Sequence, residues 1–152
     1  MDSFVFNVAK GRVAEFVHRV DANDPANSAL IIVPLSVGGT QAQGQDFASL
    51  STLLADAAWD EMTTGGWSRK TLTDANISDI TIDNSNNVSL GVLPSVSLGT
   101  PTGAIVGILV CYDADTTGGT DANIIPMTAH AYPFTGDGTA KSIQTGNFFS
   151  AM

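Results

Sequence analysis

Glutamate and lysine, which cover the exposed faces of most helices, are nearly missing from this chain. Its 152 residues include thirteen aspartates but only two glutamates and three lysines. Aspartate, asparagine, glycine and threonine, which favour turns, caps and strands, are abundant instead. The composition therefore predicts a mainly β protein with many turns.

Apolar runs of strand length, separated by turn residues, recur along the sequence. They occupy residues 4–9, 28–37, 67–73, 77–83, 88–98, 103–114 and 124–134. Pro34 in the second run predicts a sheet edge or a bulge. Residues 46–58 have apolar side chains at helical spacing, after Asp46 as a candidate N-cap. We predict one domain over residues 1–152, an antiparallel β-sandwich or jelly-roll-like fold with one main helix at about 46–58.

Residues 11–20 (GRVAEFVHRV) fit two patterns. Val13, Val17 and Val20 have helical spacing, but Val13 and Val17 opposite Phe16 and Val20 also suit a strand with two apolar faces. Glycine opens the segment and the turn-forming DANDP closes it. We therefore predict a strand here.

The net charge and the apolar runs limit the partners of the chain. A formal net charge of −9 argues against a nucleic-acid surface, because phosphate contacts need clustered lysine and arginine. The most apolar run, residues 103–112, is about half the length of a membrane-spanning helix. The start, MDSFVFNVAK, lacks the basic and apolar regions of a signal peptide. We expect a soluble protein that binds neither nucleic acid nor membranes and stays where it is made.

The residues that usually support catalysis are scattered. His18 and His130 fall on different predicted strands, and Cys111 lies inside the most apolar run, where a core role is expected. The sequence has no G-x-S-x-G elbow and no phosphate-binding glycine loop. We expect a protein that is not an enzyme and needs no cofactor.

The segment DADTTGGTD (113–121) is a candidate calcium loop. Asp113, Asp115 and Thr117 alternate, and Asp121 follows at the ninth position. Such a loop also needs a bidentate glutamate at the twelfth position, where this chain has Ile124. Because aspartate and glycine are common in ordinary turns, we expect a structural loop without metal.

Arg69 and Lys70 are adjacent in a chain with only six basic residues. On a strand their side chains point to opposite faces, so the pair is not expected to form a cationic patch. One of them can pair with an aspartate, and the other can face solvent or a partner. We expect at least one of these cations to make a specific contact with another protein.

A long neutral stretch and two apolar ends also suggest an interface. Residues 84–112 contain no Asp, Glu, Lys or Arg, and interface cores are depleted of charge. Two core strands and a neutral loop explain the stretch equally well. The ends, MDSFVF and NFFSAM, hold aromatic side chains that should pack into the domain or onto a partner as terminal arms. The candidate residues for a capsid or subunit interface are Phe4, Phe6, Trp67, Arg69, Lys70, Phe148 and Phe149.

Five stretches resemble a family of small structural proteins of tailed bacteriophages. They are FNVAKGRVAEF, NDPANSALIIVPL, RKTLTD, VCYDADTTGGTDANIIPMTAHAYPFTGDG and GNFFSA, and residues 74–102 diverge most. The resemblance implies a decoration or cement protein that is made in the host cytoplasm and binds the outside of the phage head. The implied partners are the major capsid protein and neighbouring copies of the chain, as a dimer or trimer.

Other roles remain open at this point. The chain could be another virion component, such as a head–tail connector, a tail protein or the base of a head fibre. A small enzyme or a carbohydrate-binding β domain is a further alternative outside the virion. The copy number in purified virions separates these roles.

Overall fold

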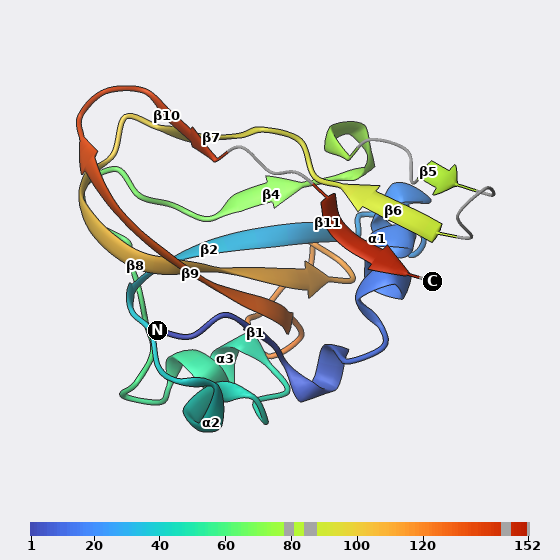
Figure 1. The fold of residues 1–152 in the computed structure, drawn as a ribbon, viewed down its shortest axis with the longest axis horizontal. Helices are drawn as coiled ribbons and strands as arrows, with labels where there is room; N and C mark the ends of the chain where they lie inside the picture. The colour runs from blue at the N-terminus through green and yellow to red at the C-terminus, as the bar shows by residue number, and fades with distance from the viewer. Residues whose placement is uncertain (78–80, 84–87, 144–146, 152) are drawn as a thin grey trace.

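Two long strands, β8 (Thr102–Asp113) and β9 (Ile125–Asp137), form the centre of the main sheet (Figure 1). The computed structural model describes residues 1–77, 81–83, 88–143 and 147–151, with side chains at 1–77 and 93–143. The strand order is β1-β9-β8-β2-β3, and β4 also pairs with β2. All of these pairings are antiparallel. The remaining strands of this sheet are β1 (Phe4–Val5), β2 (Ala29–Val37), β3 (Asp60–Glu61) and β4 (Lys70–Leu72).

Two smaller antiparallel sheets complete the β structure. In one, β7 (Val96–Gly99) pairs with β10 (Lys141–Ile143). In the other, β6 (Val88–Val92) pairs with both β5 (Thr81–Asp83) and β11 (Asn147–Ala151). The predicted mainly β, antiparallel class is therefore confirmed.

Apolar side chains lie on both faces of the main sheet, which explains why its central strands are almost continuously apolar. Along β8, Val110 and Tyr112 belong to one core cluster, and Leu109 and Cys111 belong to the other. The first cluster includes residues of β7 and β10, and the second includes Leu53 and other residues of the helical region. Figure 1 shows β7 and β10 on one side of the sheet and the short helices α2 (Gln41–Gly44) and α3 (Leu50–Leu54) on the other.

The predicted strand at residues 11–20 is wrong, because the segment forms α1 (Val13–Asp21). Phe16, Val17 and Val20 are fully or almost fully buried and follow helical spacing from Val13. On the opposite side of the helix, Glu15 pairs with Arg12 and Arg19 at the spacing that supports a helix. Packing of the apolar face outweighs the β preference of the valines.

The predicted helix at 46–58 is wrong in extent, and α1 is the one helix of seven or more residues among those described. Only Leu50–Leu54 is helical, and Ser49 caps it by accepting a hydrogen bond from the Thr52 N–H. The side chain of Asp46, the predicted cap, instead accepts a hydrogen bond from Asn7. After the helix, the Asp56 carboxylate accepts a hydrogen bond from the Ala58 N–H. This contact forms a turn in place of a further helical turn.

The strand predictions differ in how well they match the structure. The runs at 28–37, 103–114 and 124–134 correspond to β2, β8 and β9, and the run at 88–98 contains β6 and most of β7. The run at 4–9 is shorter than predicted, since a 3-10 turn, η1 (Asn7–Ala9), follows β1. Only residues 70–72 of the run at 67–73 form a strand, and a second 3-10 turn, η2 (Asp74–Asn76), follows this run. None of the helices in the described ranges is both long and apolar enough to cross a bilayer.

Candidate functional site

Three of the predicted interface residues lie inside the folded domain. Phe6 has no exposed surface, Phe4 is 9% exposed and Trp67 is 4% exposed. The rings of Phe4 and Phe6 pack against Trp59, and the indole N–H of Trp67 donates to the Thr102 carbonyl. These side chains therefore build the core and are not available to a partner. The prediction for the side chains of Phe148 and Phe149 lies outside the described residues, although the backbone of both belongs to β11.

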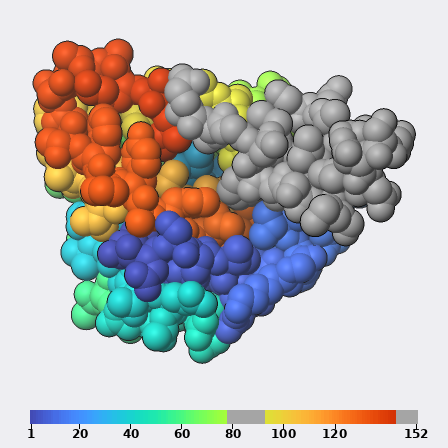
Figure 2. Space-filling view, in the orientation of Figure 1, coloured from blue at the N-terminus to red at the C-terminus, as the bar shows by residue number. Residues whose placement is uncertain are grey.

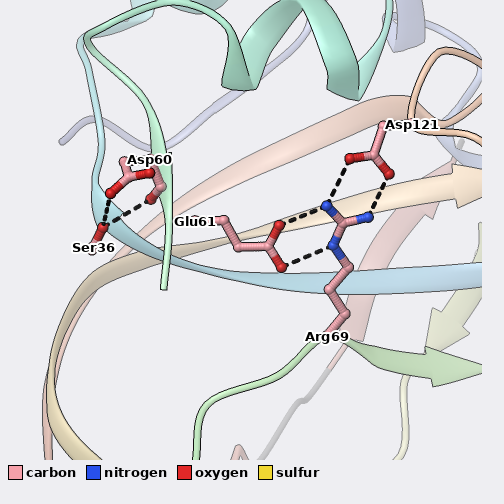
Figure 3. A network of polar contacts seen from close by, with 5 residues as sticks. All are labelled: Ser36, Asp60, Glu61, Arg69 and Asp121. Carbon is pink, nitrogen blue, oxygen red and sulfur yellow. Dashed lines mark hydrogen bonds and ion pairs between the residues drawn. The ribbon is translucent and has the colours of Figure 1, made fainter. Parts of the chain in front are cut away.

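Arg69 joins two acidic side chains from distant parts of the chain (Figure 3). Its Nε and one terminal nitrogen donate to the two carboxylate oxygens of Glu61 at 2.9 and 2.6 Å. Its terminal nitrogens also donate to both oxygens of Asp121 at 2.6 and 2.8 Å. These two bidentate pairs raise the pKa of the guanidinium further, mainly through the hydrogen bonds to Asp121 and Glu61. The structure therefore gives Arg69 a specific contact with two carboxylates of its own chain.

The Arg69 cluster, meaning Glu61, Arg69 and Asp121, holds three segments together. Glu61 belongs to β3, Arg69 directly precedes β4, and Asp121 lies in the connection between β8 and β9. The same connection is fixed to α3, because its Asp121 and Ile124 carbonyls accept the Ser51 and Leu50 N–H groups. Next to Glu61, Asp60 accepts a hydrogen bond from Ser36 of β2. The arrangement is typical of a structural clamp at one edge of the main sheet.

The candidate calcium residues do not converge on one point. The carboxylates of Asp113 and Asp115 accept N–H groups two residues further on, as in ordinary Asx turns, and that of Asp121 is bound by Arg69. Thr117 donates its hydroxyl to Asp115. Across the part of the chain that the structure describes, no three His, Cys, Asp or Glu side chains are placed to hold a metal ion together.

We expect millimolar calcium to leave the melting temperature unchanged, because the loop carboxylates already have partners. Thermal unfolding with calcium and with a chelator measures this. A rise of several degrees in calcium that Asp113→Ala abolishes would replace this interpretation with a metal site.

Cys111 and His130 lie in different surroundings: Cys111 in the apolar core, and His130 beside the Thr128 hydroxyl. Cys111 is fully buried in the core cluster that contains Leu109, and burial raises the pKa of its thiol. His130 lies within hydrogen-bond distance of the Thr128 hydroxyl at 2.8 Å, and burial lowers the pKa of its imidazole. The structure thus places Cys111 as the core residue that the sequence predicts.

The Cys111 thiol should not react with a thiol reagent such as Ellman's reagent in the native protein, since reaction needs an accessible thiolate. One thiol per chain should react once denaturant unfolds the domain. The absorbance after mixing with the reagent, recorded with and without denaturant, measures the reaction of the unfolded and of the native protein. Complete reaction of the native protein within the mixing time would contradict this burial.

A groove of about 320 Å³ lies beside β4. Residues 69–72 and Asn76 line one side, and residues 94–97 line the other. Lys70 is half-buried here, and its ammonium group donates to the Ser68 hydroxyl at 3.1 Å. Sequence reasoning singled out Lys70 but did not find the groove, because β4 and residues 94–97, which line it, are more than twenty residues apart in the sequence.

The neutral stretch divides between interior and surface. Leu93, Val96 and Leu98 are buried, as are most residues from 105 to 112. Between them Thr100, Thr102, Gly103 and Ala104 are exposed. The described part of the stretch thus supplies both core strands and an uncharged corner of the surface.

Comparisons with protein-family models, with curated proteins and with solved structures find no match to this chain.

Proposed function

We propose that the chain is a structural protein of a tailed-phage virion, a decoration or cement protein that binds the outer surface of the head and stabilises it. The observation that carries this proposal is the resemblance of five sequence stretches to such proteins. Those stretches cover the start of α1, most of β2, all of β4, the end of β8 and all of β9, which are neighbouring parts of the fold. Arg69 and Asp121, which bond each other, come from two different stretches. The resemblance therefore covers a connected framework.

The charge of the molecule supports the same role. With a net charge of −9, the protein repels DNA and other particles coated in the same way, which keeps virions dispersed. The exposed corner at Thr100, Thr102, Gly103 and Ala104 is neutral, as interface cores tend to be. In this proposal the partners are the major capsid protein and neighbouring copies, and the protein moves from the host cytoplasm to the virion surface.

Mass spectrometry of purified virions, calibrated against the major capsid protein, tests the role. A decoration protein should be present in proportion to the capsid protein. A copy number that fits a single vertex would support the alternative of a head–tail connector, a tail protein or a head-fibre base. Absence from virions would contradict every structural role.

A further inference from the structure

Residues 1–7, which we call the arm, contact the rest of the fold in the way that a bound peptide adds to a sheet. Within the arm, β1 pairs antiparallel with β9, and Phe6 extends this pairing by donating its N–H to the Met127 carbonyl at 3.0 Å. Further along β9, the Ala131 N–H donates to the Ser3 hydroxyl at 2.9 Å. Main-chain pairing of this kind is how extended segments are recognised by strand addition.

The other side of the arm is held by the segment that contains α2. Asp2 donates its N–H to the Gly39 carbonyl at 3.3 Å, and its carboxylate accepts the Gln41 N–H at 2.8 Å. The Asn7 N–H donates to the Gln45 carbonyl at 2.8 Å. Figure 2 shows the arm (dark blue) at the surface, between β9 (orange) and the segment around α2 (cyan). The arm thus occupies a site, the arm site, whose two sides come from distant parts of the chain.

The arm site is shaped for the side chains of the arm. Gly38 and Gly107 make room for Met1, because a Cβ on either glycine would collide with the Met1 side chain. Phe4 and Phe6 are buried in the core cluster that contains Leu109. Apart from residues 1–8, every described member of that cluster belongs to β2 or a later element. The attachment of the arm to α1 is therefore not needed for these contacts.

A short connection, residues 8–12, joins the arm to α1 (Figure 1). Lys10, Gly11 and Arg12 are all exposed, and a Cβ at Gly11 would have no atom within 4 Å. Gly11 has a φ of 75°, in the left-handed region that favours glycine. Because these three residues are exposed, the connection can extend with little loss of packing.

We propose that the arm exchanges between copies of the chain, so that residues 1–7 of one copy occupy the arm site of a neighbour. The exchanged arm makes the same contacts as in the closed chain, and Phe4 and Phe6 stay buried in both forms. Exchange therefore changes mainly the connection, and a high local concentration of copies favours it. The exchange itself is independent of the phage role, whereas its setting, a head surface that holds copies close together, rests on the proposed function.

A disulfide trap in the full chain tests the exchange in solution. Val5 and Thr128 are paired across β1 and β9, so cysteines at both positions can form a disulfide within one chain or between two chains. Cys111→Ala is added to remove the native thiol. On non-reducing gels, the disulfide between chains should be minor at micromolar protein and should predominate at about millimolar protein, the effective concentration that short tethers give.

The control for the trap has Val5→Cys and Cys111→Ala but keeps Thr128, so it reports random contacts between exposed cysteines. It should form far less of the linked dimer at each concentration. A disulfide that stays within the chain up to millimolar protein, or an equal amount of dimer in the control, would overturn the proposal.

Gly11→Ala gives an independent measurement that leaves the arm and its site unchanged. Alanine is strained at a φ of 75° but not in an extended connection, so the substitution should raise the association constant about fivefold, as measured by light scattering. The matched control is Gly99→Ala, because Gly99 has a φ of 78° and equally open surroundings but lies in β7. This control should leave the association unchanged. Equal association constants of Gly11→Ala and wild type would contradict the exchange.

Phage heads that lack the protein test the setting. After the cysteine-pair variant is bound to these heads, oxidation should link neighbouring copies into dimers or larger chains on non-reducing gels. Disulfides found only within single chains on the heads would overturn exchange in the virion. If the protein does not bind the heads at all, the proposed function fails, and the trap in solution alone decides whether the arm exchanges.

Discussion

Replacing Phe6 with alanine should lower the free energy of unfolding by about 3–5 kcal/mol, the usual cost of removing a buried phenylalanine. Phe6 has no exposed surface, and its ring lies 4.8 Å from that of Phe4 and 6.3 Å from that of Trp59, centre to centre. The substitution would leave a cavity where the N-terminal segment packs on the main sheet. Urea denaturation, followed by tryptophan fluorescence, measures the loss.

Val5 provides the matched control for Phe6. It lies next to Phe6 in the sequence and is 36% exposed. Val5→Ala should change the stability by less than about 1 kcal/mol. If Phe6→Ala were equally mild and instead weakened binding to phage heads, Phe6 would be an interface residue, contrary to the structure.

Replacing Arg69 with methionine should lower the free energy of unfolding by about 2–4 kcal/mol, between the values for exposed and buried ion pairs. Removal of the guanidinium leaves the Glu61 carboxylate without its cation, and the Glu61 side chain is only 14% exposed. Adding Glu61→Gln and Asp121→Asn to this variant should recover most of the stability, because no unpaired buried charge then remains. Urea denaturation of the wild type, the single variant and the triple variant measures these differences.

Lys141→Met is the control for removing a cation. Lys141 pairs with Asp137, whose side chain is 60% exposed, so its loss should have little effect. Equal stability of Arg69→Met and wild type would show that the Arg69 cluster is not a clamp.

The effect of Arg69→Met on the free energy of unfolding should also depend on pH. The hydrogen bonds from Arg69 lower the pKa of Asp121 below its usual value of 3.8. A carboxyl group whose pKa is lower in the folded state stabilises the fold above its unfolded pKa, and this contribution is lost as the pH falls through the folded pKa. The stability gap between wild type and variant should therefore be constant near neutral pH and narrow below about pH 4.

The strands that the sequence predicts best are those buried on both faces. In β2 and β8 almost every residue is apolar, and only a central strand of a covered sheet requires this. Residues 13–21 were harder to predict from the sequence, because valine favours strands. In the structure they form a helix, which buries Phe16, Val17 and Val20 on one side. Residues 46–58 have helical spacing, but their contacts with the β8–β9 connection restrict the helix to Leu50–Leu54.

The candidate site was predictable only in part. The scarcity of basic residues drew attention to Arg69 and Lys70, and the sequence predicts that one of the two cations pairs with an aspartate. The choice of Asp121, which lies 52 residues from Arg69 in the sequence, depends on tertiary structure. Aromatic residues near the N-terminus fit a partner or the core equally well by sequence. The pairing of β1 with β9 determines that Phe4 and Phe6 belong to the core.

Binding to assembled heads is the most direct test of the proposed role on the outer capsid surface. Purified protein is added to intact, DNA-filled heads that lack it, and the bound fraction is measured by co-sedimentation in low and molar sodium chloride. We predict saturable binding in proportion to the capsid protein, and binding that persists at high salt because neutral surface supplies most of the contact. Absence of binding to intact heads at any salt concentration would contradict a role on the outer surface.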